Sequence, residues 1–209
     1  MEDVLEVYTQ PYDPKRPQVC MDETSKQLLS EVREALPVQP GYPQRVDYEY
    51  QREGVADLFM FFEPLAGKRF VQVTDHRTRK DWANAMKMIA DEIYPQADKI
   101  VIVMDNLNTH SPISFYETFE AEEALRLTHR FEFHFTPKHG SWLNMAEIEL
   151  GVLVRQCLSR RIADKVTLER EVTAWQNERN LKNVRVDWQF TTADARIKLK
   201  HLYPTIRGE

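Results

Sequence analysis

The sequence has 209 residues, of which 42% are hydrophobic and 29% charged, and its formal net charge is -5. This composition excludes an intrinsically disordered chain, and the longest apolar runs, such as residues 100–104, are too short to span a membrane. The length suits one domain with appendages. Because no secretory leader opens the sequence, we expect a cytoplasmic protein without a membrane partner.

The charges are unevenly distributed along the chain. Residues 155–209 hold 12 Lys and Arg against 7 Asp and Glu, whereas residues 1–154 hold 16 against 26. Basic side chains neutralise DNA phosphates, so the C-terminal part could face DNA. A solvated helical surface explains the same charges, and charge alone favours that simpler interpretation.

The N-terminal part of the chain combines a linker pattern with one strand. Residues 1–17 contain three prolines among mixed charges, which predicts an extended linker. Residues 18–21 form a short apolar run that predicts a buried strand ending at Asp22. Residues 24–34 look helical or irregular, and the prolines within 37–43 predict a loop.

The rest of the chain alternates between strand and helix patterns. Strands are predicted at 46–52, 55–62 and 69–74, and the short segments between them, Glu53-Gly54 being the first, suit antiparallel hairpins. The later expected elements are a helix at 79–94, a strand at 99–104, helical segments around 113–128, a strand at 131–135, and helices at 144–160, 167–180 and 192–202. This order predicts a mixed sheet with helices on its faces.

Two aspartates follow directly on apolar strand patterns. Asp22 ends the first predicted strand, and Asp105 ends the β-branched run 99–104. Because open α/β sheets place ligand sites at the carboxyl ends of their strands, we expect both carboxylates to lie in one site. Taken singly, either residue could instead be an ordinary turn or helix-capping aspartate.

Glu147 interrupts an apolar stripe on a predicted helix. Its neighbours at helical spacing are apolar or small, namely Leu143, Leu150, Gly151, Val154 and Leu158. A buried carboxylate among such residues requires a metal ion or a positively charged partner, and both alternatives stay open. Glu149 projects from the opposite side of the helix, so we expect it on a solvated face.

Together, Asp22, Asp105 and Glu147 form a set of oxygen ligands. Such a set suits Mg²⁺ or Mn²⁺, whereas zinc favours His and Cys. Two such ions activate a water or a 3′-hydroxyl and stabilise the leaving oxygen in an in-line phosphoryl transfer. The sequence therefore predicts a two-metal phosphodiester chemistry.

Three segments of the chain resemble the insertion-sequence 630 branch of the Tc/mariner transposase superfamily. They are Met21-Asp22-Glu23-Thr24, residues 103–110 with the pattern Asp-Asn-x-x-x-His, and residues 136–147 with the pattern Ser-x-Leu-Asn-x-x-Glu. The resemblance implies a ribonuclease H-like fold with a five-stranded sheet and a helical C-terminal extension. It also implies cut-and-paste DNA transposition into short target sequences, with Asp22, Asp105 and Glu147 as the metal-binding triad.

The sequence departs from this family in two places. Met145-Ala146 stands where many relatives have Pro-Ile, which changes the helix entry but not the carboxylate. The family's N-terminal helix-turn-helix region has no counterpart, so we expect a catalytic part only: linker 1–17, catalytic core 18–163, and helical extension 164–209. The expected partners are DNA and, because transposition joins two ends, a second copy of the chain.

Other polar residues near the motifs are weaker candidates. Asn106 and His110 could orient the nucleophile or touch a phosphate, although such residues after a strand are commonly loop hydrogen-bonders. Basic residues that could contact DNA phosphates are Lys138, His139, Arg160 and Arg161. Trp142 could stack on a base, but a Trp that opens a helix is more often part of the core.

Three function classes are compatible with these residues. The leading one is a DNA transposase that cleaves and transfers strands. A second is another ribonuclease H-like nuclease, which cuts without strand transfer. A third is a non-catalytic remnant that pairs with an intact transposase through its helical tail. Metal binding that depends on the triad separates the first two classes from the third.

Overall fold

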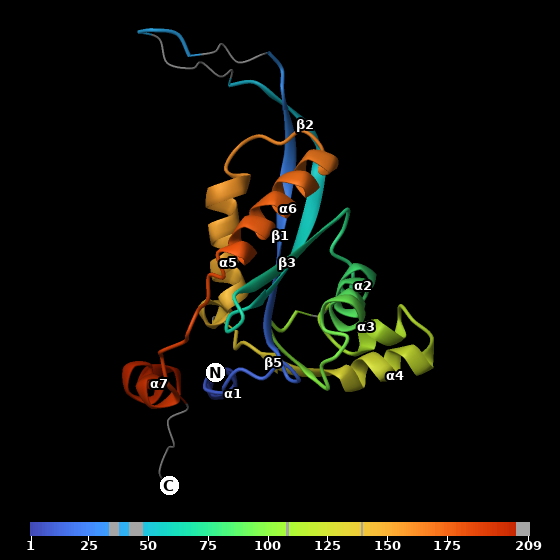
Figure 1. Ribbon diagram of the computed structural model, residues 1–209, viewed down its shortest axis with the longest axis vertical. Coiled ribbons are helices and arrows are strands. Elements are labelled where there is room, and N and C mark those ends of the chain that lie inside the picture. Colours follow the sequence, from blue (N-terminus) through green and yellow to red (C-terminus); the bar gives the residue numbers. More distant parts are fainter. Residues whose placement is uncertain (34–37, 42–47, 108, 139, 204–209) are drawn as a thin grey trace.

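The computed structural model describes residues 1–33, 38–41, 48–107, 109–138 and 140–203. These residues form a five-stranded sheet with the order β3-β2-β1-β4-β5 (Figure 1). The strands are β1 (Gln18–Glu31), β2 (Tyr50–Glu63), β3 (Lys68–Thr74), β4 (Ile100–Met104) and β5 (Phe131–Phe135). The first three strands pair antiparallel, whereas β4 and β5 run parallel to β1, so the sheet is mixed, as predicted.

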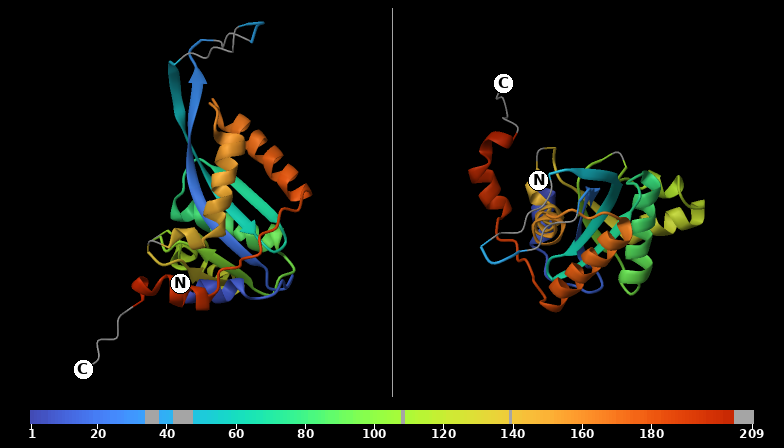
Figure 2. Two further views of the ribbon diagram at one scale, coloured as in Figure 1. Left: turned by 90° about the vertical axis from the view of Figure 1, so that its left-hand side faces the viewer. Right: turned by 90° about the horizontal axis from the view of Figure 1, so that it is seen from above.

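Helices cover both faces of this sheet (Figure 2). They are α1 (Glu2–Tyr8), α2 (Arg79–Met88), α3 (Ile113–Tyr116), α4 (Ala121–Arg130), α5 (Met145–Leu153), α6 (Lys165–Leu181) and α7 (Thr192–Lys198). The predicted helix 79–94 ends in a π-helical turn at Ile89–Ile93, and the predicted helix 144–160 ends in one at Val154–Leu158. Short 3₁₀ turns cover Ser141–Leu143 and Lys200–Leu202.

The strand period of two divides the apolar residues between two cores. Val19 and Met21 of β1 pack with Trp82 of α2, whereas Cys20 packs with residues of α5 such as Leu150. β4 is buried along its whole length because helices lie on both of its faces. This alternation decides which side chains of β1 can reach the helix that carries Glu147.

The sheet is longer than the sequence patterns predict. The predicted strand ends at Asp22, but β1 continues to Glu31 and pairs with β2 over that whole length, so the expectation of helical or irregular structure at 24–34 is wrong for 24–31. The outer half of β1 gives no strand pattern in the sequence, because Leu28 is the one buried residue among 24–31 and most of the others are polar. β1 and β2 form an arm that extends past the helices in Figure 1.

The predicted hairpin at Glu53-Gly54 is also wrong, because β2 runs straight through both residues. The strand pairing shifts register here, with Leu28 opposite Gly54 and Leu29 opposite Arg52. Gly54 has a φ of +131°, a conformation that L-residues with side chains rarely adopt. The glycine therefore marks a β-bulge and not a turn. Of the strand predicted at 46–52, residues 50–52 belong to β2, while 46 and 47 lie outside the described residues.

The predicted linker contains a packed helix. Val4 and Leu5 of α1 are fully buried, and Tyr8 donates a hydrogen bond of 2.6 Å to the carbonyl of Leu143. The guanidinium of Arg196 on α7 forms two hydrogen bonds of 2.7 Å with Glu2. An extended linker is therefore wrong for residues 2–8, because their apolar positions pack at helical spacing. Across the described ranges, no helix is long and apolar enough to cross a bilayer.

Candidate active site

Asp22 and Asp105 are brought together by the pairing of two parallel strands. Cys20 of β1 lies opposite Val103 of β4, and each aspartate follows two residues later. A separation of two residues returns a side chain to the same face of a strand. Asp22 therefore shares the face of Cys20, which is the face that α5 covers. Asp105 lies just beyond the end of β4, as predicted, whereas Asp22 lies inside β1.

The start of α5 is fixed beside Asp22 by one buried side chain. Asn144 caps the helix by accepting a hydrogen bond of 3.1 Å from the amide of Ala146. Its amide group also donates a 2.9 Å hydrogen bond to the carbonyl of Met21, the residue before Asp22. Glu147 lies in the first turn of this helix. The cap thus sets the position of the third carboxylate relative to the first.

All three predicted carboxylates line one cavity of about 490 Å³. Its other lining residues are Glu23, Thr24, Ser141, Asn144, Leu150, Gly151 and Val154. A second cavity of about 830 Å³ shares Asp105 and Ser141 with the first and is also lined by Asn106 and Lys138. The two cavities together form a hollow at the edge of the sheet, beside the carboxyl end of β4.

The electrostatics of this cavity favour a cation. Burial, together with the negative charges of Asp105 and Glu147, raises the pKa of Asp22 from 3.8 to about 7, although the amide of Glu23 opposes the shift by donating a hydrogen bond. Glu147 is exposed and has no ion-pair partner among the residues that the structure describes. A set of three carboxylates, of which Asp105 alone pairs with a basic side chain in the described part of the chain, that of His110, suits a hard divalent cation such as Mg²⁺ or Mn²⁺.

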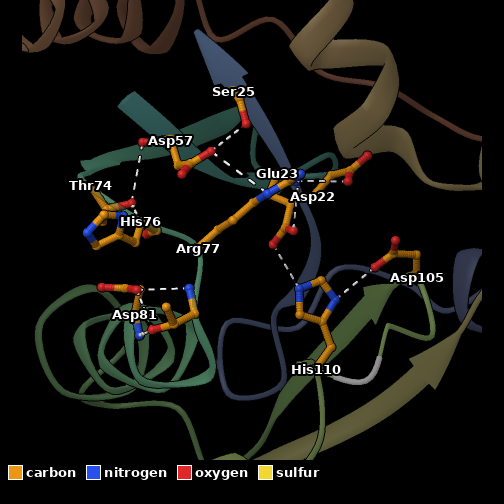
Figure 3. Close-up of polar contacts among 11 residues, drawn as sticks. Asp22, Glu23, Ser25, Asp57, Thr74, His76, Arg77, Asp81, Asp105 and His110 are labelled. Carbon is orange, nitrogen blue, oxygen red and sulfur yellow. Dashed lines mark hydrogen bonds and ion pairs between the residues drawn. The ribbon is translucent and has the colours of Figure 1, made fainter. Parts of the chain in front are cut away.

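The carboxylates line the same cavity without being drawn together into a metal coordination shell. Within the described part of the chain, no three His, Cys, Asp or Glu side chains already lie close enough to hold an ion. Figure 3 shows the carboxylate of Asp105 bound to the ring of His110.

Glu149 and Glu147 have exchanged the environments expected from the apolar stripe. Glu149 is only 4% exposed, and it accepts hydrogen bonds from the buried Arg69 at 2.7 Å and from Arg179 at 2.6 Å. The prediction of a solvated Glu149 is therefore wrong, as is that of a buried Glu147. The helix packs on β1 and β2, and the side chains of Arg69 from β3 and Arg179 from α6 reach Glu149 on its buried side. The structural ion pair considered for Glu147 is made by Glu149.

His110 is fully buried between two carboxylates. Its Nδ1 lies 2.8 Å from Asp105 Oδ1, and its Nε2 lies 2.9 Å from Glu23 Oε2 (Figure 3). Burial lowers the pKa of His110, but Asp105 and Glu23 outweigh burial and raise it to about 9. The sequence singles out His110 but not Glu23. The available signal was the strand period, which turns Glu23 to the face opposite Asp22 and toward Trp82 and His110.

The predicted DNA-contacting residues are only partly brought together. Lys138 is exposed and lines the second cavity with Asn106, whereas His139 lies outside the described residues. Arg160 forms an ion pair of 2.5 Å with Glu171. Arg161 pairs with Glu31 and donates to the carbonyls of residues 48 and 49, so it ties the loop after the π-helical turn Val154–Leu158 to the arm.

Trp142 lies at the rim of the site and belongs to an aromatic cluster. Its side chain is 40% exposed, and its ring lies 6.3 Å from that of Trp188 and 5.7 Å from that of Phe190. Both partners belong to the segment between α6 and α7. The packing interpretation therefore accounts for the inner part of Trp142, and a stacking role for its exposed edge stays a prediction.

Comparison with known proteins agrees with this fold. Two solved structures of the Mos1 mariner transposase, its paired end complexes with Mn and with Mg, match with TM-scores of 0.55 and 0.57 at 14% and 12% identity. The matches cover 87% and 98% of this chain but 55% and 62% of those chains. The Mos1 strand transfer complex matches with a TM-score of 0.56 at 13% identity, over 87% of this chain and 54% of that one.

These matches confirm the predicted ribonuclease H-like architecture. The chain spans a little more than half the length of the transposase chains that it matches. A sequence search among curated proteins found no match. The family model described as DDE superfamily endonuclease matches residues 17–169, which include Asp22, Asp105 and Glu147. On this evidence the chain belongs to the DDE superfamily of endonucleases.

Proposed function

We propose that this protein catalyses divalent-metal-dependent cleavage and strand transfer of DNA, with Asp22, Asp105 and Glu147 as the metal ligands. One observation carries the proposal: carboxylates from β1, from the end of β4 and from α5 line a single cavity. Membership of the DDE superfamily endonucleases supports the nuclease chemistry. The similar Mos1 transposase structures include a pre-cleavage transpososome and a strand transfer complex, which supports the transposase reaction.

The proposed cofactor is Mg²⁺ or Mn²⁺, with two ions in the working site. When bound, such ions polarise the attacking water or 3′-hydroxyl and stabilise the leaving oxygen of an in-line displacement. The chain's own contribution is positional. Asp22 is fixed within a central strand, Asp105 is held by His110, and Glu147 is exposed at the start of a capped helix.

The proposed partners are transposon-end DNA, target DNA and a second copy of the chain. Lys138 and Asn106 line the cavity that adjoins the carboxylates, where a phosphate or sugar of the substrate would lie. His139 is proposed beside them, and Arg160 and Arg161 along the loop after α5. We propose residues 18–163 as the catalytic core and residues 164–209 as its extension, in which α6 packs on β3 through Gln176 and Asn180.

The test compares carboxylate variants on labelled DNA that carries the terminal repeats of the element. The parent chain should nick this DNA in Mn²⁺ or Mg²⁺ and join the freed end to a target duplex. Asp105→Asn and Glu147→Gln should abolish both steps, whereas Glu169→Gln, an exposed glutamate on α6, should change neither. Nicking that survives in both triad variants would refute the assignment. Hydrolysis without joined products would identify a nuclease of another kind.

A further inference from the structure

Asp105 is oriented by a buried histidine. His110 Nδ1 lies 2.8 Å from Asp105 Oδ1, which occupies one of the two carboxylate oxygens and leaves the other for a metal ion. The His110 ring is itself held in place, because its side chain is fully buried and stacks on Trp82 with the ring centroids 5.8 Å apart. The rotamer of Asp105 therefore follows the position of His110.

Glu23 holds the other side of this histidine. Its Oε2 lies 2.9 Å from His110 Nε2, and its Oε1 lies 3.5 Å from Arg77 Nη1, so both carboxylate oxygens face cationic or hydrogen-bonding partners (Figure 3). The side chain is only 7% exposed. Although Glu23 follows Asp22 directly, the strand period points it to the opposite face of β1.

We propose that Glu23 is a positioning residue that sets the orientation of Asp105 through His110. This inference rests on the proposed metal function of Asp105. Metal ligands commonly depend on such outer partners, and removing one typically weakens metal binding by roughly 10- to 100-fold. Glu23 on β1 holds His110, and His110 in turn holds Asp105, the proposed metal ligand, in the loop after β4.

Asp57 provides a matched control within the same cluster. It lies on β2, its side chain is 11% exposed against 7% for Glu23, and it approaches the same guanidinium, with Arg77 Nε at 3.9 Å from its Oδ1. It also accepts a 2.5 Å hydrogen bond from Ser25. Its described contacts do not include His110. Asp57→Ala therefore removes a buried carboxylate beside Arg77 without removing the support of the histidine.

The experiment measures Mn²⁺ binding by calorimetry in the full chain, with folding checked by circular dichroism. Glu23→Ala should weaken Mn²⁺ binding by roughly 10- to 100-fold, and Asp57→Ala should leave it unchanged. Glu23→Gln keeps an oxygen that accepts from His110 and should restore most of the affinity. In a His110→Ala background, Glu23→Ala should add no further loss, because its route to Asp105 is already removed.

A metal-free readout accompanies these titrations. In protein with ¹⁵N-labelled histidine, Glu23→Ala should shift the His110 Nε2 signal, and Asp57→Ala should not. Parent-like Mn²⁺ affinity in Glu23→Ala, an equal loss in Asp57→Ala, or an additional loss in the His110→Ala background would each overturn the positioning role. If the parent chain bound no Mn²⁺ at all, the metal function itself would fail. If the parent bound Mn²⁺ and Asp105→Asn did not, the metal function of Asp105 would stand. In that case, parent-like Mn²⁺ affinity in Glu23→Ala would refute only the positioning role of Glu23.

Discussion

Asp22 of β1 and Asp105, just beyond the end of β4, each lie two residues after the pair that Cys20 and Val103 form between these parallel strands. The meeting of the two carboxylates is therefore a property of the strand register. Glu147 joins them because Asn144 ties the start of α5 to the carbonyl beside Asp22. Backbone pairing and one helix cap thus place three acidic side chains, distant in the sequence, around one cavity.

Divalent metal should stabilise the folded protein. Negative charges share the cavity, so an ion that binds only the folded state lowers its free energy relative to the unfolded state. At about 100 times its dissociation constant, Mn²⁺ should contribute about 2.7 kcal/mol and raise the melting temperature by roughly 5–10 °C. Thermal melts of the parent and of Glu147→Gln, each with Mn²⁺ or with EDTA, measure the effect. If Mn²⁺ raised the melting temperatures of both proteins equally, the metal would bind at a site that does not include Glu147.

The stability of the metal-free protein should depend on the ionisation of Asp22. Burial and the neighbouring carboxylates raise the pKa of Asp22 from 3.8 to about 7 in the folded state. A raised pKa contributes stability that is complete below about pH 4 and is lost as the pH rises through 7. Asp22→Asn cannot ionise, so its melting temperature in EDTA should fall less between pH 5 and pH 8 than that of the parent. The exposed Asp98→Asn serves as the control and should follow the parent; an identical pH profile for Asp22→Asn would contradict this account.

Glu149 should contribute to stability and not to chemistry. Its carboxylate lies between the fully buried Arg69 and the largely buried Arg179. Glu149→Gln leaves two cations without a counter-charge, and breaking such a buried pair costs about 3–5 kcal/mol. Urea unfolding should show that loss for Glu149→Gln and a change within about 0.5 kcal/mol for the exposed Glu169→Gln. Similar unfolding midpoints for the two variants would argue against the ion cluster.

The cap at Asn144 should affect activity beyond its effect on stability. Asn144→Ala and Thr191→Ala each remove a helix N-cap, for which the expected cost is about 0.5–2 kcal/mol. Only Asn144 also binds the strand beside Asp22, so Asn144→Ala should reduce the rate of DNA nicking well below that of Thr191→Ala. Nicking rates measured at a temperature where both variants are fully folded test this. Equal rates would show that the cap does not position Glu147.

The sequence predicted the elements whose patterns are strong. The apolar run 100–104 and the alternation at 131–135 are the strands β4 and β5, and the helical periods around 79–94 and 167–180 appear as α2 and α6. These elements are set by burial on one or both faces, which a single sequence records directly. The position of Asp105 after β4 follows from the same signal.

The remaining features depend on contacts that no local pattern contains. The outer half of β1 is mostly polar and forms a strand because β2 pairs with it. Gly54 resembles a turn residue in the sequence, and only the shift in strand register identifies it as part of a β-bulge. The environments of Glu147 and Glu149 depend on Arg69 and Arg179, which approach α5 from β3 and α6. The role of Glu23 required knowledge of which face of β1 meets His110.

Successive side chains of β1 point alternately into the two cores, so the number of residues that precede Asp22 in this strand decides which face its carboxylate occupies. Deleting a single residue between Val19 and Asp22 would turn the carboxylate toward Trp82 and bring Glu23 under α5. Such a deletion would leave the composition and the motif nearly unchanged, but it would exchange the faces on which the following side chains lie. Length changes in the chain joining β1 to β2 would carry no comparable penalty, because they leave unchanged the register in which Asp22 pairs with Met60 of β2.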